Sequence, residues 1–144
     1  MTSSDGSERR DGVAFGRARD RGGARHVRVG PHLGGGADHG TRRTVRAISN
    51  TGLCLEDIQG TLAQALDTTG ARVIFTDLPA GSCTMAVRRM IRERPGVLLV
   101  TGVNLSLLLD FAMQNVDDPA QAVQAALDRG RAAMVMHGAA VAGA

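Results

Sequence analysis

The chain has 144 residues with no Lys, Trp or Tyr, and its 17 arginines give it a formal net charge of +3 at pH 7. This length suits one domain, and a hydrophobic fraction of 43% is enough for a buried core. Residues 1–10 lack the apolar stretch of a signal peptide, and the longest apolar-rich run, residues 97–109, is too short to cross a bilayer. We therefore expect a soluble protein, located in the cytoplasm.

The positive charge is concentrated in residues 1–43, which hold nine arginines and five acidic residues, whereas residues 44–144 hold eight and nine. Ten of the 19 glycines also fall in residues 1–43, where apolar residues show almost no periodic pattern. We expect residues 1–43 to be irregular and residues 44–144 to form the folded domain. An Arg/Gly segment can attract nucleic acid, but without Trp or Tyr the chain lacks most base-stacking platforms, so we expect no nucleic-acid partner.

Strand and helix patterns alternate from residue 44 onward. Residues 45–49 predict a strand, and apolar residues at helical spacing from Leu55 to Leu66 predict the helix after it. Residues 72–77, rich in Val, Ile and Phe, predict a second strand. The amphipathic pattern that begins near Ser82 predicts a second helix, which Pro95 and Gly96 bring to an end.

The remaining elements complete the alternation. Residues 97–103 are nearly all apolar, as expected of a strand covered on both faces, and residues 105–115 predict a helix that is apolar almost all round. Asp118 and Pro119 predict the start of a last helix. The order of elements predicts an α/β fold with a doubly wound, mainly parallel β-sheet and helices on both faces.

The end of the second strand carries the most informative residues. Asp77 follows the strand, and Gly81, Ser82 and Cys83 begin the next helix, where free backbone amides and the Ser82 hydroxyl favour an anion. An acid beside an anion site is explained if a histidine lies between them, orienting one ring nitrogen toward Asp77 and accepting phosphate on the other. The alternative is that Asp77 caps the turn and Ser82 caps the helix.

Several spaced motifs resemble the IIA component of the mannose-type sugar phosphotransferase system. In that family an acid ends a strand before a Gly-Gly-Ser-type turn, a Gly-Val-Asn follows the next strand, and a Gly-Arg lies in the final helix. The matching positions here are Asp77, Gly81 and Ser82, then Gly102, Val103 and Asn104, then Gly130 and Arg131. The resemblance covers roughly residues 45–137.

The resemblance implies a phosphoryl-carrier function. A histidine of the IIA subunit would accept phosphate from the phosphocarrier HPr and pass it to a IIB partner, which delivers it to the sugar, so the protein would meet the membrane only through the transporter complex. The family implies a homodimer and needs no metal or other cofactor. It also implies that Asp77 orients the histidine, that Gly81, Ser82 and Cys83 receive the phosphate, and that Asn104 supports the active-site loop.

The family histidine follows the opening strand and is normally followed by Gly. The stretch "HVRVGPHLGGG" resembles that opening, with residues 27–29 as the strand and His32 as the phosphoacceptor, although Leu33 replaces the expected Gly. His39 has a following Gly but no strand before it. Only twelve residues separate His32 from Val45, and three of them are consecutive glycines, so a complete crossover helix is not expected there.

Two hypotheses follow from the missing family features. Residues 1–43 could be read in the wrong frame of a GC-rich gene, or the chain could be a IIA-like binding or regulatory protein that lacks a functional histidine. Neither hypothesis affects the motifs after residue 44.

Other residues have simpler interpretations. Cys83 is expected to be a small buried residue rather than a reactive thiol, and the spacing of Cys54 and Cys83 excludes the usual zinc and disulfide patterns. His137 is expected to be a surface or packing residue, and a metal shared by His32 and His39 would lack a third ligand. Arg88, Arg89 and Arg92 form either a solvated helix face or a docking site for an acidic partner.

Overall fold

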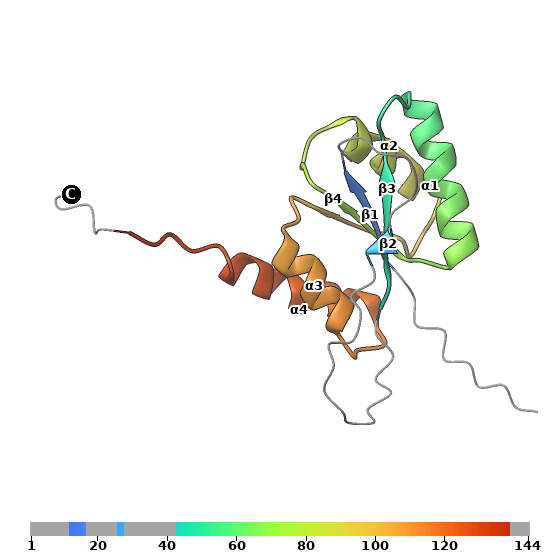
Figure 1. The fold of residues 1–144 in the computed structure, drawn as a ribbon. Coiled ribbons are helices and arrows are strands. Elements are labelled where there is room, and N and C mark those ends of the chain that lie inside the picture. Colours follow the sequence, from blue (N-terminus) through green and yellow to red (C-terminus); the bar gives the residue numbers. More distant parts are fainter. Residues whose placement is uncertain (1–11, 17–25, 28–42, 139–144) are drawn as a thin grey trace, which may run out of the picture.

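The computed structural model describes residues 12–16, 26–27 and 43–138 (Figure 1). Five strands form one sheet in the order β2-β3-β1-β4-β5. They are β1 (Gly12–Gly16), β2 (His26–Val27), β3 (Val45–Ser49), β4 (Val73–Thr76) and β5 (Leu98–Thr101). All adjacent strands are parallel except β2, which pairs antiparallel with β3 at the edge. The predicted α/β fold with a mainly parallel sheet is confirmed.

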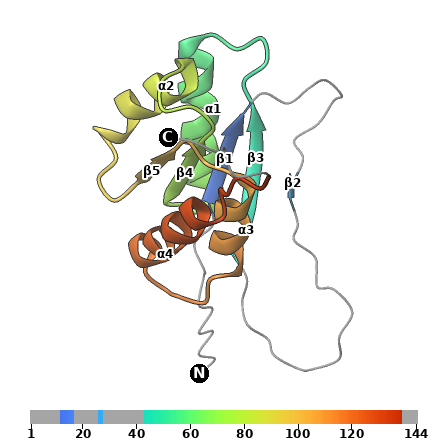
Figure 2. The same cartoon turned by 90° about the vertical axis from the view of Figure 1, so that its left-hand side faces the viewer.

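Two helices cover each face of the sheet (Figure 2). On one face, α1 (Leu55–Thr69) and α2 (Ser82–Ile91) pack over a cluster that includes Ile58, Leu62, Ile74 and Val87. On the other face, α3 (Leu105–Met113) and α4 (Pro119–Ala132) pack over Val73, Phe75, Phe111 and Val123, among others. Since β4 contributes Ile74 to one cluster and Val73 and Phe75 to the other, it is buried on both faces, as its apolar sequence requires.

The position of the opening strand corrects the sequence-based expectation. The central parallel strand is β1, from Gly12 to Gly16, within the segment expected to be irregular. Residues 26–27 form the short antiparallel edge strand β2 instead of the parallel opening strand expected at residues 27–29. A short run flanked by glycines shows no clear strand pattern alone, and here pairing on both sides, to β3 and β4, stabilises it.

Close packing explains the glycine that begins β1. A Cβ atom at Gly12 would lie 2.7 Å from Cε2 of Phe75 and 3.0 Å from Cε1 of Phe111. The two phenylalanine rings meet edge to face, with centroids 4.9 Å apart. They fill the space that a larger residue would need at position 12, so the central strand and α3 pack closely.

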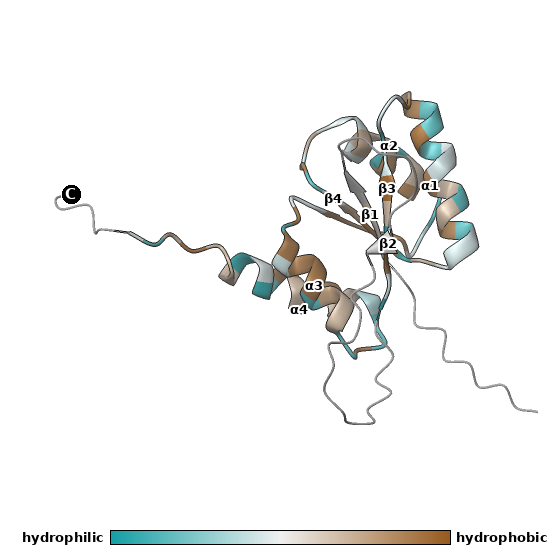
Figure 3. Cartoon of the chain, in the orientation of Figure 1, coloured by the Kyte–Doolittle hydropathy of each residue, from teal (hydrophilic) through white to brown (hydrophobic). Residues whose placement is uncertain are grey.

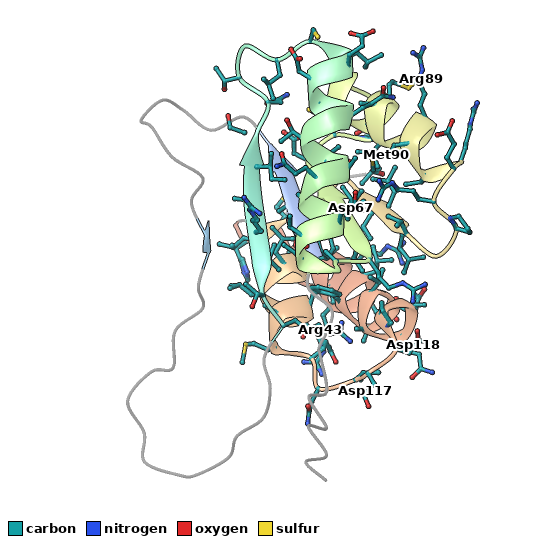
Figure 4. The ribbon with its side chains drawn as sticks, turned by 90° about the vertical axis from the view of Figure 1, so that its right-hand side faces the viewer. Arg43, Asp67, Arg89, Met90, Asp117 and Asp118 are labelled. Carbon is teal, nitrogen blue, oxygen red and sulfur yellow. The ribbon has the colours of Figure 1, made fainter. Side chains whose placement is uncertain are left out.

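Arg43 joins the start of β3 to the loop between α3 and α4. Its guanidinium lies 5.2 Å from the centroid of the Phe111 ring and donates hydrogen bonds to the carbonyl oxygens of Val116 and Asp117. Figure 4 shows Arg43 beside the loop that carries Asp117 and Asp118. This buried arginine is therefore part of the folded unit.

The helix α3 is apolar almost all round, as predicted. Leu107, Phe111 and Ala112 are buried, whereas Leu105 and Met113 are 69% and 63% exposed. Figure 3 shows the ribbon of α3 mostly in brown, the colour of hydrophobic residues. Within the described ranges, no helix is both long enough and apolar enough to cross a membrane.

Candidate functional site

The carboxyl ends of four parallel strands meet at one edge of the sheet. Gly16 pairs with Ser49, and Thr76 pairs with both Phe15 and Thr101, so β1, β3, β4 and β5 end at nearly the same level. The neighbours of β1 are β3 on one side and β4 on the other, so the strand order reverses at this centre. Ligands of open α/β sheets bind outside such a reversal point, and Asp77 is the first residue after β4 there.

Asp77 is exposed at this edge. Its Oδ1 atom accepts a hydrogen bond of 2.9 Å from the backbone amide of Leu78, so the carboxylate does stabilise its own turn. Within the described residues no hydrogen bond to Oδ2 is present, so this oxygen can accept a hydrogen bond from a proton-bearing group. The turn-capping role and an orienting role are therefore compatible.

The helix α2 begins at Ser82, as predicted. Its N-cap is Gly81, no side chain caps the helix, and the first helical hydrogen bond runs from the amide of Met85 to the carbonyl of Gly81, at 2.9 Å. The expectation that Ser82 could cap the helix is wrong, because Ser82 is already the first helical residue. Amides in the first turn have no helical acceptor, so those of Ser82 and Cys83 and the exposed Ser82 hydroxyl are suited to bind an anion.

A buried hydroxyl pair fixes the turn between β4 and α2. The Thr84 Oγ1 atom lies 2.6 Å from the carbonyl oxygen of Leu78 and 2.9 Å from Thr76 Oγ1. A hydroxyl has one proton, so when Thr84 donates to Leu78 it accepts from Thr76. Both threonines are at most 1% exposed. Thr84 is not among the site residues predicted from the sequence, where its signal is a hydroxyl residue on the buried side of the first helical turn.

Asn50, the residue after β3, contacts the first turn of α2. Its Nδ2 atom lies 2.7 Å from the sulfur of Cys83. Burial raises the pKa of the Cys83 thiol, so the thiol stays protonated at neutral pH. The interpretation of Cys83 as a small buried residue is confirmed.

Asn104 connects two helices rather than entering the sheet edge. Its Oδ1 accepts from the amide of Leu107 at 2.8 Å, which caps α3, and its Nδ2 donates to the carbonyl of Gly130 in α4 at 2.8 Å. A Cβ atom at Gly130 would lie 2.8 Å from the Cβ of Leu107 and 3.3 Å from Asn104 Oδ1. The Asn and Gly of the two spaced motifs therefore form one contact, which supports the loop after β5 indirectly.

The structure describes little of the candidate histidines. His32 and His39 lie outside the described residues, and His137 is exposed after α4, as expected. The four residues that follow β1 in the sequence are Arg17, Ala18, Arg19 and Asp20, with no histidine among them. Among the described residues, no three His, Cys, Asp or Glu side chains are grouped as a metal site would require.

Comparisons with known proteins give one clear similarity in fold. No family model and no curated protein matches the chain. Among solved structures it is similar to the mannose/sorbose-specific IIA subunit of the phosphotransferase system from Enterococcus faecalis, with a TM-score of 0.65 over 92% of this chain and 97% of that one. The identity is 14%, so the comparison confirms the resemblance at the level of the fold.

Proposed function

We propose that the protein is the phosphoryl-carrier IIA subunit of a bacterial phosphoenolpyruvate-dependent sugar phosphotransferase system. It accepts phosphate on a histidine from HPr and passes it to a IIB partner, without a metal or other cofactor. It acts in the cytoplasm as a homodimer and meets the membrane through the transporter complex. The observation that carries the proposal is the position of Asp77 at the strand-order reversal, beside the open first turn of α2.

In the proposed reaction Asp77 orients the histidine, and Ser82 and Cys83 bind the phosphoryl group. The Asp77 carboxylate accepts a hydrogen bond from the N–H of one imidazole nitrogen and so holds the ring with its other nitrogen free. That nitrogen attacks the phosphorus of phospho-HPr, forming one P–N bond as the P–N bond to HPr breaks. The Ser82 hydroxyl and the amides of Ser82 and Cys83 bind the transferred phosphoryl oxygens. In the transfer to IIB, the phosphoryl group leaves this histidine, and the P–N bond formed in the first step breaks.

The similarity in fold supports this proposal, and so do the spaced motifs. The IIA subunit from Enterococcus faecalis has the same fold over nearly its whole length. The aspartate, the serine and the asparagine expected from the resemblance lie in the segments that lead from β4 into α2 and from β5 into α3, and β4 and β5 are neighbours in the sheet. His32 remains our proposed phosphoacceptor.

The test is the mass of the intact protein after incubation with phosphoenolpyruvate, enzyme I and HPr. We expect the mass to increase by a single phosphate, acid-labile and mapped to His32 by fragmentation. Variants with His26, His32, His39 or His137 replaced by Ala identify the acceptor independently. A folded protein that takes up no phosphate would refute the carrier function.

A second function is favoured by the residues after β1. Arg17 and its neighbours stand where the resemblance places a histidine, so the chain could be a IIA-like binding or regulatory protein that is not phosphorylated. In this case the protein binds HPr or IIB but shows no phosphate in the intact-mass experiment. Binding without phosphorylation would support this alternative over the carrier function.

The misread frame is a separate hypothesis for the same observation. Sequencing the locus and the encoded transcript tests it directly. A single frame confirmed from Met1 to the end would refute it, whereas a frame change before residue 44 would restore the possibility of a histidine after the opening strand.

A further inference from the structure

The exposed side of α2 combines apolar and positively charged side chains. Leu78, in the turn before the helix, is 57% exposed, and Met85 is 48% exposed. Arg88, Arg89 and Arg92 are also exposed. We call these five residues the α2 docking face.

Helical spacing places Met85 and the three arginines on one side of α2. Arg88 and Arg89 follow Met85 by three and four residues. Arg92 follows Arg88 by four residues and Arg89 by three, so all four side chains lie on one side of the helix. Leu78 is exposed in the turn before α2, and its carbonyl accepts a hydrogen bond from Thr84 in the first turn of that helix. Figure 4 shows Arg89 at the outer surface of the molecule.

The patch begins at the candidate phosphate site. Ser82, whose hydroxyl is proposed to bind phosphate, is three residues before Met85 and exposed on the same side of α2. A typical protein interface covers about 800 Å² on each partner, which spans a helix of ten residues such as α2. One protein seated over the site therefore also covers the arginines.

The three arginines of this face differ from three other described arginines, which form ion pairs. Arg94 pairs with Asp67, Arg129 with Asp110, and Arg131 with Asp128. Within the residues that the structure describes, Arg88, Arg89 and Arg92 form no ion pair. Among the described residues the neighbouring acid Glu93 forms no ion pair with them, so the three guanidinium groups have their charge available for an outside partner, and carboxylates match their geometry.

We infer that the α2 docking face binds the protein partner that exchanges the phosphoryl group, and that this partner presents carboxylates around a small apolar centre. Leu78 and Met85 supply the apolar contact next to the transferred group, and the arginines select the acidic surface and speed its approach. The inference rests on the proposed function, because it assigns the partner of that same site.

The test is a titration of the full, isotopically labelled chain with HPr and, separately, with IIB from the same system, each at low and high salt. We expect one of them to shift the amide signals of α2. The variant Arg88→Glu/Arg89→Glu should bind that partner about tenfold more weakly or worse, with a smaller loss of affinity on adding salt. Replacing a contacting acid of the partner by Arg should restore binding to this variant.

The matched control is Arg129→Glu/Arg131→Glu. It changes the net charge by the same amount, but its residues lie in α4, on the opposite face of the sheet. We expect it to bind the partner as the unchanged protein does. Circular dichroism checks that both double variants fold.

The outcomes separate this inference from the proposed function. Equal binding by the two double variants, or no binding of either partner, would overturn the docking face even if the intact-mass experiment shows phosphorylation. Binding that depends on Arg88 and Arg89 would support the face even if no phosphate is incorporated, and the carrier function would then fail alone. If a homopolymeric RNA binds through these arginines and neither protein does, the face belongs to nucleic acid and the inference is wrong.

Discussion

At the scale of single residues, Asp77 carries the sharpest prediction. Its side chain is exposed and makes one hydrogen bond, to its own turn, so Asp77→Ala should change the free energy of unfolding by only about 0.5 kcal/mol. Loss of the group that orients the histidine should slow phosphorylation about a hundredfold or more. Initial rates of phosphate incorporation from phospho-HPr measure the effect.

The control for Asp77 is Asp117→Ala. Asp117 is also exposed, but it lies in the loop between α3 and α4, away from the end of β4. This variant should be phosphorylated at the normal rate. If both variants react equally fast, Asp77 does not orient the acceptor.

The two cysteines should differ in reactivity. Cys54 is exposed, whereas Cys83 is buried, so in the native protein an alkylating reagent can reach Cys54 but not Cys83. Iodoacetamide should therefore modify Cys54 in the native protein and Cys83 only after unfolding in urea. Peptide mass mapping against time distinguishes the two sites, and rapid modification of native Cys83 would contradict its buried position.

At the scale of helices and strands, two helical glycines have opposite surroundings. A Cβ atom at Gly60 of α1 meets nothing within 4 Å, whereas at Gly130 of α4 it would meet Leu107 and Asn104. Gly60→Ala should stabilise the protein by about 0.5–1 kcal/mol through helix propensity. Gly130→Ala should destabilise it by about 1–3 kcal/mol, because α3 and α4 must separate.

Urea unfolding followed by circular dichroism at 222 nm measures both changes. Each variant is the control for the other, since the substitution is the same and only the neighbouring atoms differ. A gain in stability for both would mean that the contact between Asn104 and Gly130 is not close in solution.

Most elements after residue 44 could be predicted from the sequence, because each has a local signal. The apolar residues of the strand from Val45, the acids after Cys54 and the Asp118-Pro119 pair mark their elements within one or two residues. β1 could not be predicted, because nothing in "GVAFG" itself requires a strand and its hydrogen-bond partners come from β3 and β4.

The candidate site also contains residues that could be predicted from the sequence and residues that could not. Asp77 and Ser82 could be predicted, since both follow directly from the end of a recognisable strand. Asn50 and Thr84 could not, because their importance comes from contacts with Cys83 and with the Leu78 carbonyl across the fold. His32 remains a prediction.

At the scale of the whole molecule, the exposed apolar side of α3 should support the proposed homodimer. Leu105, Leu109 and Met113 recur every four residues and are all exposed. Light scattering after gel filtration should give about twice the chain mass of 15.0 kDa. Leu105→Gln/Met113→Gln should reduce this mass to that of a monomer at micromolar concentration.

Met85→Gln is the control for the dimer experiment. It removes an apolar side chain of comparable exposure from α2, on the other face of the sheet. We expect this variant to remain dimeric. A monomer for the unchanged protein, or a dimer that survives the α3 substitutions, would contradict this interface.

The central place of β1 also has a consequence for synthesis on the ribosome. β1 is translated first, yet its neighbours β3 and β4 are made later, and β4 is completed only at Thr76. The nascent chain must therefore keep an unpaired strand available while α1 forms, and β3 and β4 must not pair with each other before β1 enters between them. Such long-range parallel pairing is slow. This order of translation therefore exposes the strand edges to aggregation until β3 and β4 have paired with β1.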